Sequence, residues 1–146
     1  MKKENWNESN IPDQSGKIFI VTGPTSGLGE ETTRVLSRKN ATVIMAARNI
    51  KKAESVANEI LAENKNAKID IEELDLTSLE SIKNFSHQIF KKYKNLDCLI
   101  NNAGIMACPY SKTKDGFEIQ MGTNHLGPFA LTGQLISLLK KTPNSR

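Results

Sequence analysis

Short apolar segments alternate with longer amphipathic segments along most of this chain, and this alternation restricts the fold more than any other feature. The apolar segments are rich in Ile, Val, Leu and Ala, which is typical of strands buried on both faces of a sheet; they are residues 18–21, 41–46, 69–74 and 96–100. Between them, apolar residues recur at the spacing of a helix that buries one face, in 28–39, 50–64 and 78–93. Repeated strand–helix–strand units predict an α/β protein with a parallel sheet.

The length of 146 residues suits one domain. Residues 1–15 are polar, include Pro12 and show no apolar period, so we expect a loose leader there and a domain at 16–146. A final helix is predicted near 117–141. The chain ends where a fifth strand is expected to begin. We therefore expect the apolar face of this helix and the edge of the fourth strand to be exposed. Such surfaces favour self-association, so a homo-oligomer is a further expectation.

Composition and charge exclude several classes of protein. The formal net charge is +4, from 20 Lys and Arg against 16 Asp and Glu, but acidic residues separate the lysine pairs and leave no single-sign block. We therefore expect a solvated surface and no nucleic-acid partner. The apolar segments are interrupted well before the roughly 18 residues of a membrane span. Two cysteines and no apolar leader indicate no disulfide framework, and we expect a cytoplasmic location.

A glycine-rich turn, residues 22–29, joins the first predicted strand to the first predicted helix. Glycines permit a tight turn and the close approach of a diphosphate, while the helix N-terminus offers free N–H groups and the positive end of its dipole. No Lys-Ser or Lys-Thr follows the glycines, which excludes a P-loop. The turn predicts a nucleotide site in a Rossmann-type, doubly wound parallel sheet that is truncated after the fourth strand and the following helix. The predicted contacts are Gly23, Thr25, Ser26, Gly27, Leu28 and Gly29.

Four ordered motifs resemble those of the short-chain dehydrogenase/reductase family, most closely its retinol-dehydrogenase-like branch. The turn at 22–29 matches that family's T-G-x-x-x-G-x-G, and Leu-Asp-Leu at 74–76 matches its acidic residue after the third strand. Asn-Asn-Ala-Gly at 101–104 matches its N-N-A-G signature, and Asn124 matches its active-site Asn. The resemblance implies an oxidoreductase that moves hydride between a nicotinamide and a small-molecule alcohol or carbonyl. It adds cofactor contacts from Asp75, Leu76, Asn102, Ala103 and Gly104.

The end of the second predicted strand bears on the choice of cofactor. An acidic residue there accepts hydrogen bonds from the ribose of NAD, whereas Arg favours the additional phosphate of NADP. Ala47 occupies the acidic position and Arg48 follows it. We therefore expect NADP(H) rather than NAD(H). The alternative is that Arg48 is only a surface charge.

Asn124 also has a physical argument of its own. In a regular helix the N–H of residue 128 would bond the carbonyl of Asn124, but Pro128 has no N–H. The free carbonyl is available to hold a water, and the resemblance implies that this Asn supports a proton relay through such a water. A proline kink that serves packing alone is the alternative.

The resemblance implies a catalytic Ser and a Tyr-x-x-x-Lys pair after the fifth strand, and the Lys lowers the Tyr pKa toward neutral pH. One match occurs in this sequence, Tyr110 with Lys114, but it follows Pro109 and runs into Asp-Gly, which predicts a loop rather than one face of a helix. We do not assign it to catalysis, and we expect the 146 residues alone to be inactive. No His or Cys cluster has metal-ligand spacing, and Cys98 is expected to be an inert thiol. A non-catalytic nucleotide-binding or regulatory fragment remains the rival hypothesis.

Overall fold

Four parallel strands form one sheet, as the apolar segments predict. The computed structural model describes residues 6–146. The strands are β1 (Ile18–Thr22), β2 (Thr42–Ala47), β3 (Lys68–Glu73) and β4 (Cys98–Ile100), each within two residues of its expected bounds. Their order in the sheet is β3-β2-β1-β4. The sheet therefore grows outward from β1 in both directions.

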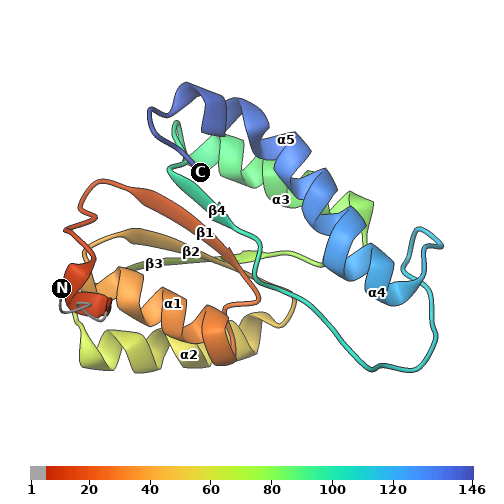
Figure 1. The fold of residues 1–146 in the computed structure, drawn as a ribbon, viewed down its shortest axis with the longest axis horizontal. Helices are drawn as coiled ribbons and strands as arrows, with labels where there is room; N and C mark the ends of the chain where they lie inside the picture. Colours follow the sequence, from red (N-terminus) through yellow and green to blue (C-terminus); the bar gives the residue numbers. More distant parts are fainter. Residues whose placement is uncertain (1–5) are drawn as a thin grey trace, which may run out of the picture.

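Helices cover both faces of the sheet (Figure 1). On one face lie α1 (Gly27–Arg38) and α2 (Ile50–Glu63), and on the other lie α3 (Leu79–Lys92) and α5 (Gly127–Lys141). The strand residues alternate between the two layers, because successive side chains of a strand point to opposite faces. Ile20 and Ile44 join the core under α3 and α5, whereas Val21 and Met45 belong to the cores under α1 and α2. This is the doubly wound α/β arrangement that the sequence predicts.

The change of direction at β1 determines where a ligand can bind. The connections through α1 and α2 carry the chain outward to β3, and the connection through α3 returns it to the other side of β1. In such sheets the loops at the carboxyl ends of the two central strands diverge and leave a cleft between them. The loops after β1 and β4 flank that position here.

The expected exposure of the last helix is wrong for most of its apolar face. Leu131 and Leu135 are fully buried, and Leu138 and Leu139 nearly so, because α5 packs along α3 and over the sheet. The prediction assumed that only a fifth strand would cover this face, whereas α3 covers it. Phe129, which was also expected to be exposed on this helix, does stay exposed, at 73%.

The predicted final helix is divided into three parts. A short α4 (Ile119–Met121) leads into a π-helical turn, η2 (Gly122–Leu126), which continues directly as α5. The N–H of Gly127 donates to the carbonyl of Gly122, five residues earlier. Pro128 follows at once, so the irregular turn lies where the missing N–H interrupts regular helix bonding.

Residues 6–15 of the expected leader are attached to the domain. A single 3-10 turn, η1 (Glu8–Asn10), pairs the Glu8 carboxylate with the Arg38 guanidinium, at 3.0 Å. The Gln14 N–H donates to the Lys39 carbonyl at 2.7 Å, and Gln14 is itself buried. Contacts thus join part of residues 6–15 to the domain, residues 1–5 lie outside those described, and the loose leader stays a prediction. The domain boundary at residue 16 remains a prediction.

One residue meets the edge of β4 opposite β1. The N–H of Arg146 donates to the Asp97 carbonyl at 2.9 Å, and the N–H of Leu99 donates to the Arg146 carbonyl at 3.0 Å. These two bonds have the alternating direction of a parallel ladder. Arg146 thus lies where a strand neighbouring β4 is expected.

Candidate functional site

A cleft with a volume of about 640 Å³ opens at the carboxyl ends of all four strands. That size lies within the usual range for small-molecule sites, which is about 300–1,000 Å³. Most of the predicted cofactor residues line this cleft: Gly23, Thr25, Ser26, Leu28, Arg48, Asp75, Leu76, Asn102, Ala103 and Gly104. Gly27, Gly29 and Asn124 are not among the lining residues. Further lining residues that the sequence analysis did not single out include Asn49, Lys52, Thr77, Ile105 and Thr123.

The glycine turn after β1 presents the uncapped start of α1 to the cleft. Gly23 and Gly27 adopt positive φ values of 64° and 57°, which favour glycine. The helix begins at Gly27, and Ser26 at its N-cap makes no side-chain hydrogen bond to the first turn. By contrast, Asn49 caps α2 and Ser78 caps α3. The first N–H groups of α1 are thus available to an anion in the cleft.

Gly29 packs against the two motifs that flank the cleft. Its predicted contact with the cofactor stays a prediction. In the structure Gly29 is buried, and a Cβ at this position would overlap the Gly23 carbonyl oxygen and the Asn102 side-chain nitrogen. The glycine is therefore required for packing within the protein itself.

Hydrogen bonds join the first turn to the Asn-Asn-Ala-Gly motif. The Thr22 hydroxyl is buried and accepts from the N–H groups of Asn102 and Ala103, both at 3.0 Å. The Asn102 side chain donates to the Thr22 carbonyl at 2.9 Å, and a Cβ on Gly23 would come within 2.9 Å of the Ala103 Cα. We call Thr22, Gly23, Gly29, Asn102 and Ala103 the cleft floor. The two motifs, about 80 residues apart in sequence, form one rigid unit.

Positive charge lines the cleft beyond β2. Ala47 is buried at the end of the strand, and Arg48 lines the cleft directly after it. Lys52, one turn into α2, lines the same wall. Lys52 could have been found from the sequence, because the helix predicted at 50–64 places it in the first turn, four residues after Arg48. Sequence reasoning stopped at Arg48 and missed this second cation.

Asp75 is the only carboxylate among the cleft-lining residues of the described chain. Its Oδ1 accepts from the N–H and the hydroxyl of Thr77, at 3.0 and 2.7 Å, and its Oδ2 lies 3.1 Å from the Lys114 ammonium. Burial opposes ionisation, but the hydrogen bonds from Thr77 and the Lys114 charge outweigh it, so the pKa of the Asp75 carboxyl is held below its ordinary value. Asp75 is therefore a fixed, ionised acceptor at neutral pH.

Asn124 makes two hydrogen bonds to the segment that follows the cleft floor. Its side-chain oxygen accepts from the Ile105 N–H at 2.8 Å, and its side-chain nitrogen donates to the Ile105 carbonyl at 2.7 Å. The amide is thereby used to hold the backbone beside Gly104. Any proton-relay role is left to the backbone carbonyl of Asn124, to which Pro128 has no N–H to donate.

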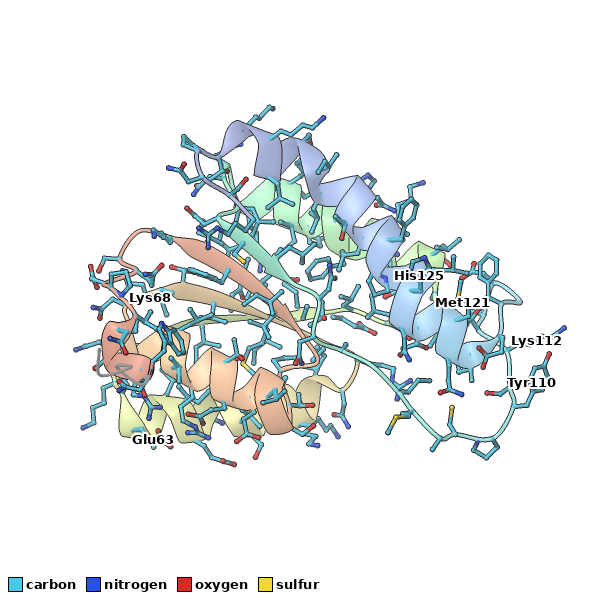
Figure 2. All side chains as sticks on the ribbon, viewed as in Figure 1. Glu63, Lys68, Tyr110, Lys112, Met121 and His125 are labelled. Carbon is cyan, nitrogen blue, oxygen red and sulfur yellow. The ribbon has the colours of Figure 1, made fainter. Side chains whose placement is uncertain are left out.

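Tyr110 and Lys114 do not share a helix face. Both lie in the loop before α4; the Tyr110 side chain is 75% exposed, and Lys114 is paired with Asp75. In Figure 2 Tyr110 lies at the outer end of this loop, away from the sheet. The arrangement agrees with the rejection of this pair as a catalytic unit.

Other reactive groups offer little chemistry. Burial raises the pKa of the Cys98 thiol, as expected for an inert cysteine. Within residues 6–146 no group of three His, Cys, Asp or Glu side chains is arranged to hold a metal ion. In the same part of the chain no helix is long and apolar enough to cross a membrane.

The donor set of the cleft suits a nicotinamide dinucleotide. The open start of α1 and the glycines offer N–H groups to a diphosphate, Arg48 and Lys52 offer charge to a phosphate, and the remaining walls mix apolar and polar side chains.

Comparison with known proteins agrees with this assignment. Residues 17–146 match the short chain dehydrogenase family. Retinol dehydrogenase 12 of Mus musculus is 47% identical over 131 residues, which cover 90% of this chain and 42% of that protein. Retinol dehydrogenase 13 of Homo sapiens is 44% identical and covers 90% of this chain and 40% of that protein. The chain thus spans about two fifths of the length of these relatives.

Solved structures show the same fold. An uncharacterized protein from Mycobacterium paratuberculosis is 43% identical, with a TM-score of 0.81, over 92% of this chain and 47% of the other. A short chain dehydrogenase from Escherichia coli, solved with NADPH, is 30% identical, with a TM-score of 0.76, over 89% of this chain and 56% of the other. With its ordered motifs, doubly wound sheet and cleft, the chain belongs to the short-chain dehydrogenase family of oxidoreductases and resembles the retinol dehydrogenases within it.

Proposed function

We propose that this chain forms the NADP(H)-binding part of an oxidoreductase that interconverts an alcohol and a carbonyl compound. The observation that carries the cofactor preference is the charge beyond β2, where Arg48 and Lys52 line the cleft and Ala47 stands in place of a carboxylate. Two cations favour a 2′-phosphate, and no acid is present there to bond a free ribose hydroxyl. The related Escherichia coli structure holds NADPH, and one from Shigella flexneri holds NADP.

The remaining lining residues divide along the dinucleotide. The backbone from Gly23 to Gly29 and the open start of α1 would hold the diphosphate. Asp75 and Leu76 would lie beside the adenine, because the resemblance to the family gives that place to the acidic residue after the third strand. Asn102, Ala103 and Gly104 would line the nicotinamide half, where the cofactor, when bound, gives or takes hydride. The carbonyl of Asn124 would hold a water near that end.

Proton transfer is proposed to need groups outside these 146 residues. Tyr110 is exposed on a loop and Lys114 is engaged with Asp75, so neither is placed to serve a substrate oxygen. Without a positioned acid or base the rate falls by about a hundred- to ten-thousand-fold.

Calorimetry with NADPH and NADH tests the binding proposal. We expect NADPH to bind more tightly by about 1–3 kcal/mol, the scale of charge-assisted hydrogen bonds. Equal affinities would contradict the preference, and binding of neither cofactor would contradict the function.

Turnover with a panel of aldehydes and ketones tests the chemistry. The 146 residues should bind NADPH without oxidising it, and Tyr110→Phe should change nothing. Turnover that disappears in Tyr110→Phe would restore Tyr110 as the acid. Turnover that survives it would place another acid within the chain.

A further inference from the structure

The loop before α4 is fastened to the turn after β3 at three points. The Lys114 N–H donates to the Thr77 carbonyl at 3.0 Å, and the Asp115 carboxylate accepts from the Leu79 N–H at 2.8 Å, at the start of α3. The third point is the contact of the Lys114 ammonium with Asp75 Oδ2, at 3.1 Å. The first two contacts already join the loop to this turn, so the ion pair calls for an explanation besides attachment.

Stability does not supply that explanation. The Lys114 side chain is 68% exposed, and ion pairs with so exposed a partner contribute little to folding. Its partner is nonetheless the one carboxylate among the described residues that line the cleft. With Oδ1 bound by Thr77 and Oδ2 by Lys114, the carboxylate is fixed in one orientation and kept ionised.

The charge of Asp75 matters because the proposed ligand is itself strongly negative. A bare carboxylate in the cleft would repel a phosphorylated dinucleotide, whereas a carboxylate paired with a cation is nearly neutral at a distance. At contact distance it still accepts hydrogen bonds, since each carboxylate oxygen has more than one acceptor position. An uncharged donor such as the exocyclic amino group of adenine is the group that such an acceptor selects.

We propose that Lys114 is a positioning residue for recognition of an adenine base: it acts through Asp75, which it holds as an oriented, charge-compensated acceptor for the exocyclic amino group. This inference rests on the proposed function and deepens it. It assigns the loop before α4, and not only the strand ends, to cofactor specificity.

The test compares dissociation constants for NADPH and for its deamino analogue, in which hypoxanthine replaces adenine, measured by calorimetry on the full chain. Lys114→Met should weaken the binding of both dinucleotides, because the uncompensated carboxylate repels their phosphates. It should weaken NADPH binding by about fivefold more than binding of the deamino analogue, because only adenine has the amino group from which the oriented carboxylate accepts. Lys114→Arg should restore NADPH binding to within about twofold. Lys112→Met is the matched control, since Lys112 lies on the same loop and makes no ion pair within the described residues (Figure 2).

A second variant guards against indirect effects. Where Asp75→Asn is already present, Lys114→Met should change NADPH affinity by less than about twofold, whether or not the loop loses order. Equal weakening of both cofactors by Lys114→Met would reveal general charge attraction and overturn the inference, as would unchanged NADPH affinity. A parent chain that binds neither dinucleotide would overturn the proposed function, and this inference with it.

Discussion

At the cleft floor the Thr22 hydroxyl binds two backbone N–H groups at 3.0 Å, and Gly23 packs directly on Ala103, whereas in the segment 105–118 Met106 and Tyr110 are 86% and 75% exposed. The floor is closely packed by contacts between its own residues. The segment is attached to the domain near its two ends, through Ile105 and through the Lys114 and Asp115 contacts. The floor is thus fixed by contacts between two motifs, whereas much of the segment 105–118 is exposed, as is usual for loops.

Gly29→Val gives the largest expected effect and tests how rigid the floor is. Its side chain would overlap the Asn102 amide and the Gly23 carbonyl, and the Gly23 carbonyl belongs to the backbone and cannot move aside easily. We expect a loss of about 3 kcal/mol or more in the free energy of unfolding, with no NADPH binding.

Gly133→Ala is the control for that variant. Gly133 lies within α5 with open space around it, so Ala should leave the protein unchanged or stabilise it by about 0.5–1 kcal/mol. Urea denaturation measures both variants. A Gly29→Val protein of normal stability and affinity would show that the floor can rearrange around a larger side chain. The floor would then not be more rigid than the loop.

Thr22→Val comes next and removes one hydroxyl from the floor. The N–H groups of Asn102 and Ala103 would lose their acceptor in a partly buried place, which costs on the order of 2 to 4 kcal/mol for the two amides. Thr132→Val, whose hydroxyl pairs with Asn101 nearer the surface, should cost less than about 1 kcal/mol. Similar losses in the two variants, measured by urea denaturation, would contradict a special role for the floor.

The same contrast explains how far the sequence could predict this molecule. Strands and helices follow from local apolar periodicity, so their bounds were predicted to within one or two residues for most elements. The glycine turn and the Asn-Asn-Ala-Gly motif also carry local signals, and ten predicted residues do line one cleft. The Rossmann-type arrangement then follows from the order of these elements.

What could not be predicted depends on contacts between distant residues. Lys114 meets Asp75 from 39 positions away, and Asn124 meets Ile105 from 19, with no spacing rule to connect them. The close approach of Gly29 to Gly23 and Asn102 was likewise not predicted, because only the fold brings these residues together. The burial of the α5 leucines was missed because no local pattern in the sequence says which helix will cover which.

Exchange of Ala47 and Arg48, at the end of β2, tests the selectivity between NADPH and NADH. Arg48→Ala combined with Ala47→Asp should shift the preference for NADPH over NADH by about 1–3 kcal/mol, because a cation is removed and an acceptor for ribose hydroxyls is added. Lys52→Ala alone should shift it in the same direction and by less. Calorimetry with both cofactors measures the change. An unaltered preference in the double variant would place the 2′-phosphate elsewhere.

Asn124 joins the two regions, and its replacement is expected to have the smallest effect. Asn124→Ala loses two hydrogen bonds to the Ile105 backbone, and because this site is partly exposed, water can replace them; we expect a loss of about 0.5–1.5 kcal/mol in unfolding free energy. Hydrogen exchange should accelerate at Ile105 and following residues, and not at Asn102 or Ala103, which Thr22 holds.

Asn124→Asp tests the same two hydrogen bonds to Ile105 through the pH dependence of stability. An ionised Asp can accept from the Ile105 N–H but repels its carbonyl, whereas a protonated Asp again offers one donor and one acceptor. The protonated form is therefore favoured in the folded protein, so the pKa of the Asp carboxyl is raised above its unfolded value of about 3.9. As the pH falls toward the raised pKa, the hydrogen bonds between residue 124 and Ile105 become stronger and the folded protein becomes more stable. Measured against Asn124→Ala at each pH, to cancel acid effects elsewhere, Asn124→Asp should be no more stable at pH 7 and more stable near pH 4.5. A difference that does not change with pH would mean that Ile105 is held by its neighbours, and that the floor alone orders the start of the exposed segment.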